Sequence, residues 1–109
     1  MKVPKSAKQF RLDKNLPNNH QLYLYYHDIT PTFGDIIYEE SFGDWSGDTL
    51  LVLKNNNRFG YLRFGWGSCS GCDSLEACST DDEYDAIIKL LWESIVWFDN
   101  KEEIIIWLN

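Results

Sequence analysis

The chain has 109 residues, of which 44% are apolar and 16% aromatic, and this composition suits one folded domain rather than a disordered segment. Its 17 acidic and 10 basic residues give a net charge of −7, so its acidic body should repel nucleic acid and attract basic protein surfaces. No stretch approaches the roughly 18 apolar residues of a membrane span, and the beginning of the chain lacks the apolar run of a signal peptide. We therefore expect a cytoplasmic protein with reduced cysteines.

Residues 1–19 are predicted to form a basic arm or lead-in, ahead of a single domain over residues 20–109. Five of the ten basic residues lie in the first fourteen positions. Their spacing does not match a regular amphipathic helix, and Pro17-Asn18-Asn19 favours a turn where the arm ends. Charges on such an arm can contact phosphate or simply keep the protein in solution.

The next part of the chain predicts an antiparallel meander. Aromatic, alternating or nearly continuous apolar runs indicate strands at residues 22–26, 36–42, 49–54 and 58–64. Turn-forming residues separate these runs at positions 30–34, 43–48 and 55–57. The run at 49–54 is almost entirely apolar, so it should lie at the centre of the sheet.

The clearest helix begins at Thr80-Asp81-Asp82-Glu83, a capping box in which the Thr80 hydroxyl can accept a hydrogen bond from the Glu83 amide. Apolar residues then recur at helical spacing from Tyr84 to Phe98. Residues 103–108 are predicted to form a last strand. The sequence thus predicts an α+β fold, in which a four-to-five-stranded antiparallel sheet (a meander) packs against one long C-terminal helix.

Glycine, serine and cysteine are concentrated between Gly65 and Cys78, in the segment GWGSCSGCDSLEAC. Its three cysteines have the spacing C-x2-C-x5-C, and two thiolates two residues apart can bind one tetrahedral zinc ion. The predicted ligands are Cys69, Cys72 and Cys78, with His27 or His20 as the fourth. The same thiols can instead be buried without metal, form a disulfide or redox pair, or supply a catalytic nucleophile.

Catalysis has the weakest support among these alternatives. No Lys, Arg or His lies near the cysteines in sequence to lower the pKa of a thiol. The segment GWGSCSG lacks the Lys-Ser/Thr ending of a phosphate-binding loop. Glu39 and Glu40 are neighbours on a predicted strand, so they point to opposite faces and cannot act as a close pair. We therefore expect that the protein is not an enzyme.

Two tryptophans lie in or beside predicted loops, where such side chains either anchor a protein interface or cover a core. The acidic residues around the second tryptophan and at the helix start would suit a basic partner. The predicted partner-binding residues are Trp45, Trp66, Asp73, Glu76, Asp81, Asp82 and Glu83.

The run from Tyr61 to Cys78, YLRFGWGSCSGCDSLEAC, resembles a family of small uncharacterised proteins of phages and bacteria that carry a GWGSCSGCD-type signature. The segment Gly47–Val52 and the acidic helix that follows fit the same pattern, over roughly residues 43–98. The resemblance carries no catalytic role. It implies a mobile-element setting, where small acidic proteins often bind and block a host defence machine.

These observations predict a small acidic binding protein that inhibits a host nucleic-acid-handling defence protein. An anti-CRISPR protein that binds a CRISPR effector nuclease is an example. The alternative is a zinc-stabilised adaptor domain that uses the C-x2-C-x5-C loop, so the cofactor is either zinc or none. No membrane and no direct nucleic-acid partner are expected for the acidic body.

Overall fold

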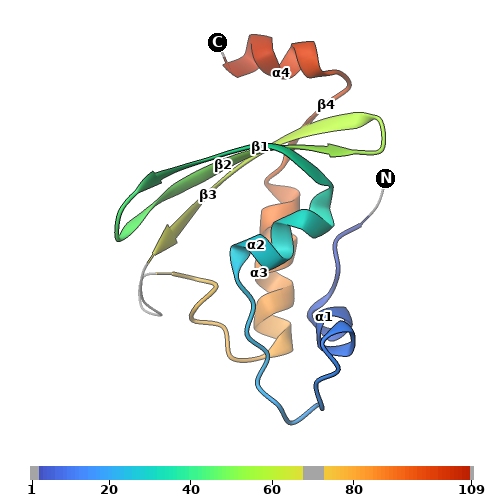
Figure 1. The fold of residues 1–109 in the computed structure, drawn as a ribbon, viewed down its shortest axis with the longest axis vertical. Coiled ribbons are helices and arrows are strands. Elements are labelled where there is room, and N and C mark those ends of the chain that lie inside the picture. Colours follow the sequence, from blue (N-terminus) through green and yellow to red (C-terminus); the bar gives the residue numbers. More distant parts are fainter. Residues whose placement is uncertain (1–2, 68–72, 109) are drawn as a thin grey trace.

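A computed structural model of the protein describes residues 3–67 and 73–108 (Figure 1). Its helices are α1 (Ala7–Asp13), α2 (Tyr26–Ile29), the 3-10 helix η1 (Thr30–Phe33), α3 (Asp81–Glu93) and α4 (Lys101–Leu108). Its strands are β1 (Asp35–Gly43), β2 (Ser46–Asn55), β3 (Arg58–Gly67) and β4 (Val96–Phe98). The strands form one antiparallel sheet in the order β1-β2-β3-β4, so the predicted α+β class and meander are confirmed.

The sheet separates two groups of helices. Helices α1, α2, η1 and α3 lie on one face of the sheet, and α4 lies on the other (Figure 1). Strand β2 alternates between these faces, so Leu51 and Leu53 enter the main core while Val52 faces the side of α4. None of the helices in the described ranges is long and apolar enough to cross a membrane.

Three of the predicted strands are confirmed. The runs at 36–42, 49–54 and 58–64 lie within β1, β2 and β3. The hairpin between β2 and β3 turns at Asn56, which has a φ of 57° that asparagine tolerates better than most residues. In the resulting register, Leu51 of β2 lies between Glu39 of β1 and Leu62 of β3.

The predicted strand at residues 22–26 is wrong. Leu22 and Leu24 are buried and Tyr23 is exposed, so the alternation that suggested a strand is present. The Tyr84 hydroxyl of α3, however, donates a hydrogen bond to the Leu22 carbonyl at 2.9 Å and accepts one from the Leu24 amide at 3.4 Å. A side chain therefore takes the backbone bonds that a neighbouring strand would have made, and α2 begins at Tyr26.

The helix predicted from Thr80 begins as expected. The Thr80 hydroxyl accepts a hydrogen bond from the Glu83 amide at 3.2 Å, and the Glu83 carboxylate accepts from the hydroxyls of Thr80 and Ser79. Tyr84 and Ile88 are buried on the core side of α3. The Thr80 side-chain cap thus fixes where α3 begins.

The single long C-terminal helix is a wrong prediction. Helix α3 has 13 residues and ends at Glu93, after which Val96–Phe98 pair with β3 as β4. The predicted strand at 103–108 is instead part of α4. Its beginning is capped by Asn100, whose side chain accepts from the Glu103 amide at 2.9 Å, while Glu103 accepts from the Asp99 amide at 3.1 Å. The Asn100 cap favours the beginning of a helix over a strand.

The segment predicted as a basic arm or lead-in contains α1, which packs against α3. Ser6 caps α1 by accepting a hydrogen bond from Gln9, and the Ala7 amide donates to the Asp85 carboxylate of α3 at 2.7 Å. Phe10 is buried in the main core. Residues of this segment therefore contribute to the same core as the sheet.

Candidate protein-binding site

The closed end of the β1–β2 hairpin projects beyond the helices (Figure 1). We call residues 38–48 the hairpin end. Gly43 has a φ of 114°, which favours glycine, and a Cβ atom at Gly47 would collide with the carbonyl of Phe42. This tight turn places Trp45 at the tip, where 81% of its surface is exposed.

Exposed aromatic and acidic side chains share the hairpin end. Tyr38 is 50% and Phe42 46% exposed. Glu39, Glu40 and Asp44 are exposed, and they have no ion-pair partner among residues 3–67 and 73–108. The hairpin end therefore combines large apolar side chains with uncompensated negative charge.

A cleft of about 230 Å³ lies between the hairpin and α2. Its lining residues are Tyr26, His27, Thr30, Glu39, Ser41, Thr49, Phe64 and Trp66. The Thr49 hydroxyl links the strands beneath it, because it bonds the Ser41 hydroxyl at 2.7 Å and accepts from the Trp66 indole at 3.0 Å. The half-buried Trp66 is thus held against the sheet by a hydrogen bond as well as by packing.

An adjoining hollow of about 220 Å³ shares Tyr26, His27 and Trp66 with this cleft and extends to Glu76, which is exposed. The exposed His27 ring stacks on Tyr25, with 5.6 Å between the ring centroids and 4° between their planes. The structure therefore brings three predicted partner-binding residues, Trp66, Asp73 and Glu76, to one hollowed surface.

Asp73 is a buried residue of this hollow. It is 5% exposed, and its carboxylate accepts hydrogen bonds from the amides of Gly67, Leu75 and Glu76 and from the Tyr26 hydroxyl. The pKa of Tyr26 is raised, chiefly by burial and further by the nearby Asp73. Asp73 therefore joins the end of β3 to the following turn through hydrogen bonds within the chain.

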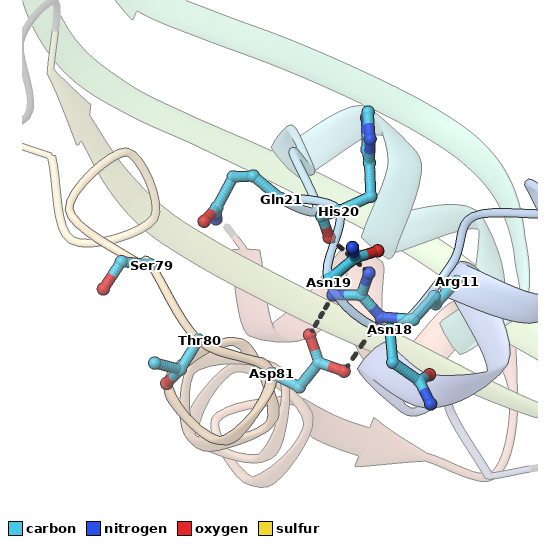
Figure 2. Close-up of a pocket in the computed structure, with 8 residues that line it drawn as sticks. All are labelled: Arg11, Asn18, Asn19, His20, Gln21, Ser79, Thr80 and Asp81. Carbon is cyan, nitrogen blue, oxygen red and sulfur yellow. Dashed lines mark hydrogen bonds and ion pairs between the residues drawn. The ribbon is translucent and has the colours of Figure 1, made fainter.

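The acidic start of α3 is partly occupied by the chain itself. Asp81 forms a two-point ion pair with the buried Arg11 of α1, at 2.7 and 3.2 Å, and Arg11 also donates to the carbonyl of His20 (Figure 2). A further hydrogen bond runs from Arg11 to the carbonyl of Pro17. The hydrogen bond from Arg11 lowers the pKa of Asp81 below its usual value. This contact joins α1 to α3, and it lies beside a pocket of about 290 Å³.

Asp82 and Glu83 remain exposed at the same helix start, although Glu83 also takes part in the cap. The predicted residues thus lie in separate places. Trp45 is at the tip of the hairpin, Trp66 and Glu76 line the hollow beside α2, and Asp82 and Glu83 are at the start of α3. The structure does not gather the predicted partner-binding residues into one site.

The zinc prediction falls mainly on residues outside those that the structure describes, since Cys69 and Cys72 lie between residues 67 and 73. Cys78 is half-buried, its thiol donates to the Ser74 carbonyl at 3.4 Å, and burial, followed by Glu83 and Asp73, raises its pKa. Within the described ranges, no three His, Cys, Asp or Glu side chains are placed to share a metal ion. Zinc binding through this loop, with His27 or His20, stays a prediction.

Sequence reasoning missed the contribution of β1 to the hairpin end. Tyr38 and Phe42 point to the side of α4, opposite Val52 and Asp48 of β2, and both are half exposed. The available signal was the stretch YEESFGD, which has acidic residues at successive positions and no basic residue. A strand with acidic residues on both faces is typical of the edge of a sheet.

Comparison of the chain with models of protein families, with curated proteins and with solved structures finds no match in any of the three. The chemistry of its own surface is therefore the basis on which a function is assigned.

Proposed function

We propose that this protein is a small acidic binding protein, not an enzyme, that blocks a nucleic-acid-handling defence protein of a bacterial host, as anti-CRISPR proteins do. The observation that carries this proposal is the hairpin end, where Trp45 is 81% exposed and the carboxylates of Glu39, Glu40 and Asp44 have no ion-pair partner within the described ranges. Tryptophan is enriched among the residues that dominate binding energy in protein interfaces.

The chemistry of the hairpin end suits a basic partner. Proteins that bind nucleic acids do so largely through Lys and Arg side chains that neutralise phosphates. The carboxylates of Glu39, Glu40 and Asp44 can pair with those same cations, so binding here would exclude the nucleic acid. Because the charges are exposed, affinity should fall as salt is raised, while the Trp45 contact should be less sensitive to salt.

Inhibition of cleavage tests the proposal directly. The purified chain would be mixed with guide-loaded CRISPR effector nucleases, and both cleavage of target DNA and complex formation would be measured. We expect loss of cleavage with at least one nuclease, and Trp45→Ala should weaken that inhibition by about 30-fold, the effect of an interface anchor.

Leu90→Ala is the matched control, since Leu90 is also a large exposed apolar residue but lies on α3. Leu90→Ala should inhibit the nuclease as strongly as the wild type does. The absence of any complex and of any loss of cleavage, across all the effectors tested, would contradict the proposed function.

A further inference from the structure

Strand β1 forms an outer edge of the described sheet. It has nine residues, of which Ile36 is half-buried and all the others are exposed. In an edge strand, alternate residues direct their N–H and C=O groups away from the sheet, where another strand can bind them. The side of β1 opposite β2 is thus a row of backbone donors and acceptors open to a partner.

This edge has acidic side chains and one irregularity as protection against strand addition, but neither lysine nor proline. Natural edge strands are protected by charged side chains, inward-pointing charges, proline, bulges or short length. In Asp35–Gly43 every charge is negative, and the one irregularity lies between Ile36 and Tyr38. From Tyr38 to Gly43 the pairing with β2 is regular, so this stretch can pair regularly on its open side as well.

The side chains of this stretch indicate which kind of segment fits. Glu39 lies on the core face, opposite Leu51, and Glu40 lies on the α4 face, opposite Leu50. Tyr38 and Phe42 flank Glu40 on that same face. An added strand would therefore meet negative charge on both of its faces and apolar surface on one.

We propose that the β1 edge binds an extended, basic segment of the partner protein as a fifth strand. Lys or Arg side chains at successive positions of that segment would lie beside Glu39 and Glu40, and apolar side chains would lie beside Tyr38 and Phe42. Backbone hydrogen bonds supply affinity in this mode of recognition, and the alternating side chains supply specificity. The nature of the partner rests on the function proposed above, whereas the chemistry of the edge does not.

A second copy of the chain is a poorer occupant of the same edge. Glu39 is the midpoint of Asp35–Gly43, so an antiparallel pair of β1 strands with full overlap would place Glu39 opposite its own copy. Like charges directly opposite each other destabilise a strand pair. Since β1 carries no basic residue, a shift in register does not supply opposite charges.

A blocked synthetic peptide, TVTRKVT, is a suitable probe, because its alternation puts Val-Arg-Val on one face and Lys with Thr on the other. Titration of isotope-labelled protein, followed by NMR, should give a Kd of about 1 mM or tighter at low salt, with amide shifts centred on β1. Two further peptides carry N-methyl groups on odd or on even residues. One of them should bind and the other should not, because a single peptide edge pairs with β1.

The charge requirement is tested with Glu39→Lys/Glu40→Lys, which should lower the peptide affinity at least tenfold. The variant Glu93→Lys/Glu102→Lys has the same net charge as the first variant but changes exposed residues away from β1, so its affinity for the peptide should fall much less. Equal losses in both variants would overturn the proposal, as would no shift at millimolar peptide, or equal binding by the two N-methylated peptides. Self-association through β1 would also overturn it, in favour of a second copy.

These outcomes are separate from those of the nuclease assay. If the chain inhibits a nuclease and Glu39→Lys/Glu40→Lys inhibits equally well, the edge proposal fails and the proposed function stands. If the peptide binds β1 as described but no nuclease is inhibited, the proposed function fails and the edge remains a site for basic segments.

Discussion

Substitution of Asp73 tests whether this residue supports the fold rather than a partner interface. Its Oδ2 atom accepts from the Gly67 amide at 2.8 Å, and its Oδ1 atom accepts from the Leu75 amide at 2.9 Å, the Glu76 amide at 3.2 Å and the Tyr26 hydroxyl at 3.1 Å. Asp73→Ala removes all four bonds. Asp73→Asn keeps an oxygen for the last three and places an NH2 group against the Gly67 N–H.

The expected costs differ accordingly. A hydrogen bond to a charged group contributes about 1.5–3 kcal/mol, and a buried donor left unpaired costs a similar amount. Because water can replace some of the bonds, we expect Asp73→Ala to lower the free energy of unfolding by about 3 kcal/mol. Asp73→Asn loses the bond from the Gly67 amide and leaves that N–H facing the new NH2 group, so we expect its free energy of unfolding to fall by about 2 kcal/mol. For a domain of this size the larger loss lowers Tm by about 10 °C.

Urea unfolding followed by tryptophan fluorescence, together with calorimetry, measures both variants. Asp44→Ala is the control, since Asp44 is exposed and its loss should change stability by less than about 0.5 kcal/mol. If Asp73→Ala behaved like this control, or if Asp73→Asn lost as much as Asp73→Ala, the four-bond account of Asp73 would be wrong.

Three further outcomes follow from the charges and thiols of the described residues. Because Arg11 lowers the pKa of Asp81 in the folded state, the pair stabilises the fold above the unfolded pKa of about 3.9, and this contribution is lost as pH falls. The stability difference between the wild type and Asp81→Asn should therefore shrink below about pH 4, and a constant difference in acid titrations would contradict this. In the Cys69→Ser/Cys72→Ser variant, the raised pKa of Cys78 should make alkylation by iodoacetamide at about pH 8 slower than in urea, and equal rates would refute the shift. Elemental analysis should find the same zinc content in Cys78→Ser as in the wild type, whereas a loss of about one zinc per chain would show that the C-x2-C-x5-C loop binds metal.

Elements specified by nearby residues could be predicted from the sequence. The strands around Asn56 and the start of α3 at Thr80 depend on a turn residue and on a side-chain cap, both of which act within a few positions. The end of α3 could not be found in this way. The residues from Ile95 to Phe98 are apolar, which suits a helix face and a buried strand alike, and pairing with Phe59 and Tyr61 of β3 decides between them.

Contacts distant in sequence also explain the other errors. The stretch at 22–26 has the alternation of a strand, but Tyr84, about 60 positions later, satisfies its backbone. Asp73 reads as a surface acid beside a glycine-rich loop, and its hydrogen bond to Tyr26 turns it inward. Trp45, in contrast, was correctly placed in a turn, because the glycines on either side of it signal one in the sequence itself.

The distribution of ion pairs leaves carboxylates at the hairpin end that could bind a basic partner. The sequence separates a basic beginning from an acidic body, which suggests a uniformly acidic domain. In the structure five of the positive charges form ion pairs: Lys5 with Asp13, Arg11 with Asp81, Arg58 with Asp99, Arg63 with Asp48 and Lys89 with Glu93. Glu39, Glu40 and Asp44 are among the acidic residues left without such a partner within the described ranges. These carboxylates lie at the hairpin end and along the open edge of β1, where a basic strand would gain both charge pairing and backbone hydrogen bonds.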